Sequence, residues 1–112
     1  MYIKPIPRNL LIHTATLKHK LAGDAWGEGA ENEQVLNYVR MEPKKTLEYS
    51  KENQTLNLNS LLFIDAVNST QPVEISVDDV IEWGGEIFTI KSIDKQYALD
   101  GTTLHHYEIG LI

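Results

Sequence analysis

The chain has 112 residues, of which 16 are acidic and 10 are basic, and its formal net charge is −6 at pH 7. This length fits one domain, 1–112. The absence of cysteine excludes disulfide frameworks, cysteine-ligated metal centres and thiol chemistry. No apolar run approaches the roughly 20 residues that span a bilayer, and Pro5 and Pro7 interrupt the N-terminus where a signal peptide needs its apolar core. We therefore expect a small, acidic, soluble and intracellular domain with no membrane partner.

Alternation of apolar and polar residues is the main structural signal in the chain. In the first such segment, Leu11, Ala15 and Leu17 share one face of an extended chain with His13. Later segments are rich in β-branched and aromatic residues or alternate with period two, and Asp65 is a plausible stop. We predict strands at residues 10–17, 35–41, 55–64, 80–82, 86–94 and 104–112.

Turn residues separate the last three predicted strands. Gly84 and Gly85 favour a tight hairpin turn, and Asp100 with Gly101 predicts a second one. No window of ten or more residues keeps a helical period of 3.6. The sequence therefore predicts an all-β fold, a small antiparallel β-barrel or sandwich of five to six strands.

Two segments, 20–34 and 43–54, do not fit the strand pattern, and we expect both to be long loops. The first holds three glycines, four acidic residues and one aromatic residue, Trp26, whereas the second is mostly charged and polar. Long loops on small scaffolds are commonly functional. Trp26 is a candidate binding anchor, with a lid folded back on the barrel as the alternative.

Charge is distributed unevenly along the chain. Residues 1–20 carry four basic and no acidic residues, whereas residues 55–112 carry nine acidic and two basic ones. Two unlike faces of this kind favour contacts between different partners or between successive copies, although surface charges in short chains also vary by chance. The candidate interaction residues are Lys4, Arg8, Trp26, Lys44, Lys45 and Tyr49.

Motifs for catalysis, cofactors and metals are missing from the sequence. The chain lacks HxH, HExxH, P-loop and dinucleotide patterns, and its serines lie in no nucleophile elbow. His105 and His106 are adjacent on a strand, so we expect their rings to point to opposite faces. Asp78 and Asp79 indicate a polar turn rather than an acid–base pair. We therefore expect no catalytic residue, no cofactor and no metal site, and we place three aromatic residues in the core: Trp83, Phe88 and Tyr107.

Three stretches resemble the minor capsid proteins of tailed phages and prophages of Gram-positive bacteria. They are residues 4–16 (KPIPRNLLIHTAT), 79–90 (DVIEWGGEIFTI) and 105–109 (HHYEI). The rhythm of the second stretch is also similar to that of phage head-closure, or head–tail joining, proteins. The resemblance covers both ends of the chain and leaves the middle loops unmatched.

The resemblance implies a structural virion protein that is not an enzyme. Its expected partners are further copies of itself in a homomeric ring, together with the portal or adaptor and tail proteins of the phage. Such a ring connects head to tail and helps retain packaged DNA, which passes through without specific binding. The implied location is the head–tail interface of the virion, after assembly in the host cytoplasm, and the two loops would contact neighbouring subunits.

Two alternatives follow from the residues alone. One is an OB- or SH3-like binding module, which needs exposed aromatics among basic residues. The bases cluster in residues 1–20 and 40–51 while most aromatics lie elsewhere, which weighs against it. The other is a small β-barrel enzyme with a metal site built on His13 or His106.

Overall fold

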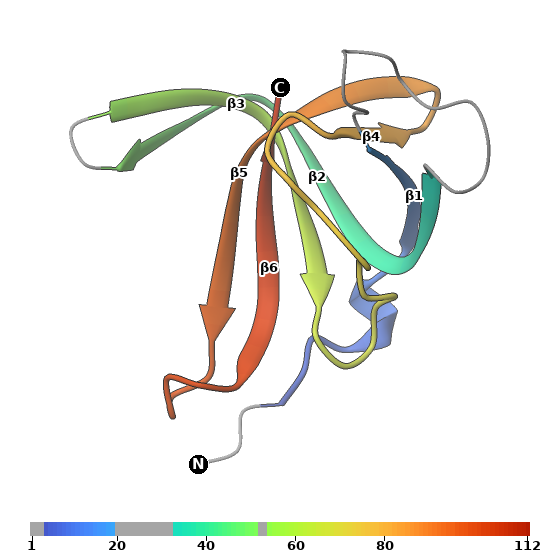
Figure 1. The fold of residues 1–112 in the computed structure, drawn as a ribbon, viewed down its shortest axis with the longest axis vertical. Coiled ribbons are helices and arrows are strands. Elements are labelled where there is room, and N and C mark those ends of the chain that lie inside the picture. The colour runs from blue at the N-terminus through green and yellow to red at the C-terminus, as the bar shows by residue number, and fades with distance from the viewer. Residues whose placement is uncertain (1–3, 20–32, 52–53) are drawn as a thin grey trace.

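The chain forms a closed six-stranded antiparallel β-barrel (Figure 1). A computed structural model describes the backbone of residues 4–19, 33–51 and 54–112, and the side chains of these residues apart from 44–51 and 54–58. The strand order is β1-β2-β3-β6-β5-β4, and pairing of β1 with β4 closes the barrel. This confirms the predicted all-β antiparallel barrel. The strands are β1 (His13–Lys18), β2 (Glu33–Lys51), β3 (Gln54–Asp65), β4 (Val80–Trp83), β5 (Glu86–Tyr97) and β6 (Leu104–Leu111).

Alternate strand positions fill the barrel interior, as closure of a sheet requires. Leu17 of β1 and Ile109 of β6 are fully buried, and so is Leu62 of β3. Each such side chain contributes about 1.5–3 kcal/mol when it leaves water. Phe88 lies in this core, and Trp83 and Tyr107 pack partly buried against it.

The two predicted hairpin turns are confirmed by backbone geometry. Gly84 and Gly85 have φ values of +59° and +80°, which suit the turn between β4 and β5. Gly101 has a φ of +75° between β5 and β6, and the Asp100 carboxylate accepts the N–H groups of Thr102 and Thr103.

The first strand begins later than the alternation predicted. Pro7 precedes a 3₁₀ turn, η1 (Arg8–Leu10), in which the Leu10 N–H donates to the Pro7 carbonyl oxygen at 3.0 Å. β1 therefore starts at His13, although Leu11 is buried as expected. Among the described residues, no helix has the length and apolar character needed to cross a membrane.

The prediction of a loop at 43–54 was wrong for its described backbone. Residues 43–51 continue β2, and Gln54 begins β3, so the two strands form a long hairpin that projects from the barrel (Figure 1). The ladder changes register between Pro43 and Leu47, an irregularity that accommodates proline. Leu47 and Tyr49 stand at alternate positions of β2 and pair in register with Leu58 and Leu56 of β3, a strand pattern that is short and lies among charged and polar residues.

The loop predicted at 20–34 is described only at its end. Glu33 and Gln34 belong to β2, where they pair with Lys18 and Leu17 of β1. Residues 20–32, which include the candidate anchor Trp26, lie outside the described residues.

Candidate interaction surface

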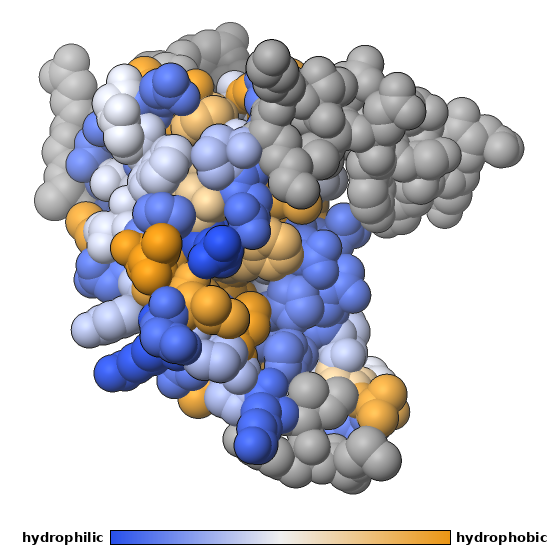
Figure 2. Space-filling model, turned by 180° about the vertical axis from the view of Figure 1, so that it is seen from behind, coloured by the Kyte–Doolittle hydropathy of each residue, from blue (hydrophilic) through white to orange (hydrophobic). Residues whose placement is uncertain are grey.

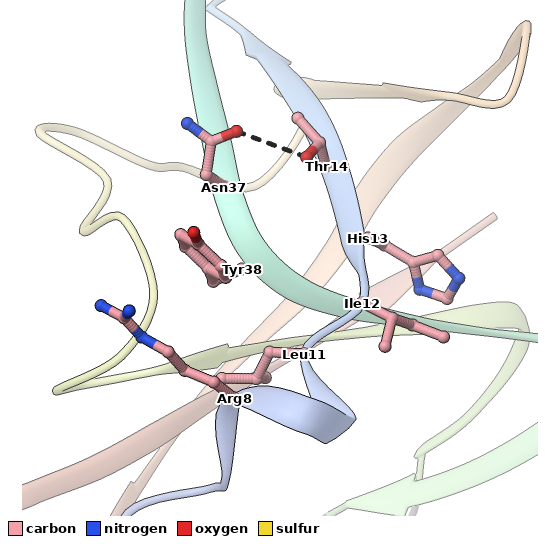
Figure 3. Close-up of a pocket in the computed structure, with 7 residues that line it drawn as sticks. All are labelled: Arg8, Leu11, Ile12, His13, Thr14, Asn37 and Tyr38. Atoms are coloured by element: carbon pink, nitrogen blue, oxygen red, sulfur yellow. Dashed lines mark hydrogen bonds between the residues drawn. The ribbon is translucent and has the colours of Figure 1, made fainter.

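A groove of about 530 Å³ opens where the N-terminal segment meets the first two strands (Figure 3). Residues from η1, β1 and β2 line it: Arg8, Leu11, Ile12, His13, Thr14, Asn37 and Tyr38.

Arg8 and Tyr38 form the most specific contact in the groove. The Arg8 guanidinium carbon lies 4.7 Å from the centroid of the Tyr38 ring, a cation–π arrangement (Figure 3). Tyr38 is 47% exposed, and Ile12, which also lines the groove, is 64% exposed. Among the side chains that the structure describes, no carboxylate forms an ion pair with Arg8. The groove therefore offers a positive charge held over an aromatic ring and flanked by apolar surface.

A β-bulge places Tyr38 in this position. Between the pairs His13–Val39 and Ala15–Leu36, β2 advances by three residues while β1 advances by two. At the bulge, where β2 has one residue more than β1, Tyr38 takes a φ of +56°. This backbone conformation is uncommon for a bulky residue. Bulges of this kind redirect a side chain, and here the phenol ring is turned toward solvent.

Hydrogen bonds from the β3–β4 connection hold the bulge. The Ser69 hydroxyl donates to the Tyr38 carbonyl oxygen. The backbone of Asn37 exchanges hydrogen bonds with Thr70, whose hydroxyl accepts at 3.2 Å and whose N–H donates at 3.0 Å. On the groove side, the Thr14 hydroxyl donates to the Asn37 side-chain oxygen at 3.3 Å (Figure 3). These hydrogen bonds on both sides of the bulge hold the Tyr38 backbone at its positive φ.

The other basic groups near the groove are paired. Arg40 donates to Glu42 at 3.1 Å and to the Leu10 carbonyl oxygen at 3.1 Å. Lys18 lies 2.8 Å from Glu82 and 3.6 Å from Glu33, and the hydrogen bond to Glu82 raises the pKa of its ammonium group. Among Arg8, Lys18 and Arg40, the side chains of which the structure describes, Arg8 is therefore the one without an ion pair and so available to a partner.

His13 has a structural role in the groove wall. Its Nδ1 accepts the Met41 N–H at 2.9 Å, and its ring meets that of Trp83 edge-on at 4.9 Å. His19 pairs instead with Asp79 at 3.0 Å. Within the described residues, no group of three potential ligands could hold a metal ion.

One expectation about the histidines was wrong. The Nδ1 atoms of His105 and His106 lie only 2.8 Å apart, so the two rings do not point to opposite faces. The β5–β6 ladder changes register between Gln96 and Tyr97, beside these residues, and such irregularities increase local twist.

The predicted interaction residues fall in separate places. Lys4 and Arg8 lie exposed in the N-terminal segment. Lys44, Lys45 and Tyr49 lie on the projecting part of β2, with side chains outside the described residues. The alternation pattern of the sequence does not indicate that Tyr38 and Ile12 are exposed in a groove. The spacing of three between Leu36 and Val39, where a regular strand has two, was the available signal for the bulge.

Acidic and apolar residues are also exposed outside the lining of the groove. Glu86 is exposed beside Ile87, which is 68% exposed at the start of β5, and Glu74 and Val73 are exposed in the β3–β4 connection. The chain has no lysine or arginine between residues 52 and 90. Figure 2 shows that hydrophobic side chains also gather in the middle of the face opposite to Figure 1, with hydrophilic ones around them.

Comparison with known proteins identifies the family. No curated protein and no solved structure shows significant similarity to the chain. A family model described as "Minor capsid protein" matches residues 7–111, nearly the whole chain. The resemblance drawn from residues 4–16, 79–90 and 105–109 is thereby confirmed. The chain therefore belongs to the phage minor capsid protein family.

Proposed function

We propose that the chain is the subunit of a homomeric ring that joins the head of a tailed phage to its tail and helps to retain the packaged DNA. Membership of the minor capsid family supports a structural role in the virion. The observation that carries the finer proposal is Arg8 over Tyr38, without an ion-pair partner among the described side chains, in a groove whose lining does not include the exposed residues Glu86 and Ile87.

Two unlike surfaces suit a ring. In a ring each subunit presents one face to its neighbour on one side and a different face to its neighbour on the other. Arginine and tyrosine are among the residues that dominate binding energy at interfaces, especially where apolar surface surrounds them. Ile12 supplies that surface on the groove side, and Ile87 supplies it on the acidic side.

DNA would pass such a ring without being held. Residues 55–112 carry a net charge of −7, and acidic surfaces repel phosphates. We expect no salt-dependent binding of the purified chain to duplex DNA.

Mass measurement of the assembled chain tests the proposal. Wild-type protein, alone or with the phage portal, should give a closed oligomer in native mass spectrometry and rings by electron microscopy. Arg8→Glu should weaken assembly by at least about 30-fold, the effect of losing one hot-spot residue. Lys95→Glu is the matched control, because it makes the same charge change at an exposed residue of β5 outside the groove.

The outcomes separate the ring from the alternatives. A chain that stays monomeric with the portal present contradicts the ring. Equal loss of assembly in both variants shows that net charge, rather than the groove, controls association. Binding to DNA that weakens as salt rises would favour the OB- or SH3-like module instead.

A further inference from the structure

The N-terminal segment, residues 4–10, belongs to no strand (Figure 1). Its backbone is nevertheless hydrogen-bonded to side chains of β3, of the turn after β3 and of β6. The Ile6 N–H donates to the Asp65 carboxylate at 2.9 Å, and the Asn68 amide donates to the Ile6 carbonyl oxygen at 2.8 Å. One further contact reaches the segment from β6, because the Nε2 atom of His105 lies 2.7 Å from the Lys4 carbonyl oxygen.

That last contact is the end of a continuous chain of hydrogen bonds. The Nδ1 of His105 lies 2.8 Å from the Nδ1 of His106. The Nε2 of His106 lies 2.8 Å from the Glu108 carboxylate. Three successive contacts therefore connect the Lys4 backbone to a carboxylate on β6.

The number of protons in this chain follows from what each atom can do. The Lys4 carbonyl oxygen only accepts, so the facing Nε2 of His105 carries a proton. An ionised Glu108 also only accepts, so the Nε2 of His106 carries a proton too. The two Nδ1 atoms can then bond only if one of them is protonated and the other is not. The pair thus holds three ring protons and one positive charge, which the Glu108 carboxylate balances. If Glu108 is protonated and donates to the Nε2 of His106, the two rings and the carboxylate together still hold three protons.

Groups on the neighbouring strands face this chain of hydrogen bonds. On β5, Asp94 lies directly opposite Glu108 and Gln96 lies opposite His106. Like charges opposite each other on neighbouring strands are destabilising, so a positive charge beside Asp94 and Glu108 offsets that cost.

The remaining neighbours contribute less. Asp65 on β3 is the register partner of His106, but its carboxylate already accepts three backbone N–H groups. The Phe63 ring lies 6.2 Å from the His106 ring. Two further charged residues from the described parts of these elements are exposed: Lys95 on β5 and Lys4 in the N-terminal segment.

We propose that His105, His106 and Glu108 form a single proton-binding site that fastens the N-terminal segment when it holds one shared proton. Loss of that proton leaves two Nδ1 lone pairs facing each other, and gain of another leaves two N–H groups facing each other. Either change breaks the contact between the rings and frees His105 to move. Attachment of residues 4–10 is therefore strongest at an intermediate pH and weaker on both sides. The segment carries Lys4 and Arg8. The site therefore controls whether these two cations are held in place against the barrel, whether or not the chain forms a ring.

Hydrogen exchange of the full-length chain across a pH series tests the site. After correction for the intrinsic pH dependence of exchange, protection of the Ile6 amide should pass through a maximum. It should fall by about tenfold on each side, the effect of losing one hydrogen bond. Nitrogen-15 spectra of the rings at that maximum should show both Nε2 atoms protonated and one proton shared by the two Nδ1 atoms.

Two variants and one control make the test specific. His105→Gln keeps an amide donor for the Lys4 carbonyl but cannot titrate, and His106→Phe keeps a ring beside Phe63 but holds no proton. Both should flatten the profile at Ile6. His19→Gln removes a histidine that contacts Asp79 elsewhere and should leave the maximum in place. A flat or one-sided profile in the wild-type chain overturns the proposal, and so does a maximum that survives in both test variants or an unprotonated Nε2.

Discussion

The buried carboxylate of Asp65 accepts the backbone N–H of Ile6 at 2.9 Å, which joins the end of β3 to a segment 59 residues earlier in the chain. The same side chain accepts the N–H groups of Val67 and Asn68 at 2.9 and 2.8 Å. One side chain thus ends a strand, shapes the following turn and holds the N-terminal segment.

Replacement of Asp65 should be costly. In Asp65→Ala, three backbone donors lose their acceptor, two of them in the turn after β3, and unsatisfied polar groups of this kind are expensive. We expect the free energy of unfolding to fall by about 3 kcal/mol, measured by urea denaturation. Glu74→Ala is the control, because Glu74 is exposed and should change stability by less than about 0.5 kcal/mol. Equal free energies of unfolding for the two variants would show that the hydrogen bonds to the Asp65 carboxylate do not stabilise the fold.

The core should respond to loss of volume at Leu62. This residue is fully buried on β3, and Leu→Ala in such a site removes apolar contacts and leaves a cavity. We expect Leu62→Ala to lower the free energy of unfolding by about 2–5 kcal/mol, seen as a lower melting temperature. Val73→Ala, at an exposed position, should leave the melting temperature nearly unchanged. A small effect at Leu62 would contradict a packed barrel interior.

The β4–β5 turn should depend on backbone conformation rather than on space. A Cβ atom at Gly84 would meet nothing within 4 Å, but the φ of +59° is unfavourable for side-chain-bearing residues. Gly84→Ala should therefore cost about 1–2 kcal/mol. Gly84→Asn should cost less, because asparagine adopts positive φ more readily. If alanine and asparagine prove equally tolerated in chemical denaturation, the turn does not have this geometry.

The β5–β6 turn provides a test of pH dependence. Hydrogen bonds from the Thr103 hydroxyl, the Thr103 N–H and the Thr102 N–H lower the pKa of Asp100 to about 2. A depressed carboxyl pKa stabilises the folded state above the unfolded value of 3.8, and this contribution is lost as pH falls toward about 2. Thr103→Val removes the largest cause and should raise the Asp100 pKa toward its ordinary value, as followed by carboxyl chemical shifts. An unchanged titration would mean that the hydroxyl does not hold the carboxylate.

Much of the fold could be predicted because a barrel strand has one face toward a core. In the segments that end at Leu17 and at Leu111, the alternating apolar residues are those whose side chains are buried in the barrel core. In the projecting hairpin after Pro43, the first strand has only Leu47 and Tyr49 as large apolar residues among charged and polar ones, so its composition is close to that of a loop. The bulge at Tyr38 and the contact between His105 and His106 arise from irregular registers, which depend on neighbouring strands and cannot be read from one strand alone.

The site was predictable only in part. Arg8 was identified from its charge and its place in a basic N-terminal segment. Tyr38, which positions it, was not, because residue type alone does not separate an exposed aromatic from a core one. The interaction roles of Lys44, Lys45, Tyr49 and Trp26 remain predictions.

Electron microscopy of particles made without this chain tests the central claim most directly. In a phage that lacks the gene, we predict DNA-containing heads that lose their DNA and separate, unattached tails. Supplying the wild-type chain should restore complete virions, and the Arg8→Glu variant should restore far fewer than the Lys95→Glu control. Complete, DNA-filled virions in the absence of the chain would contradict a role in joining head to tail.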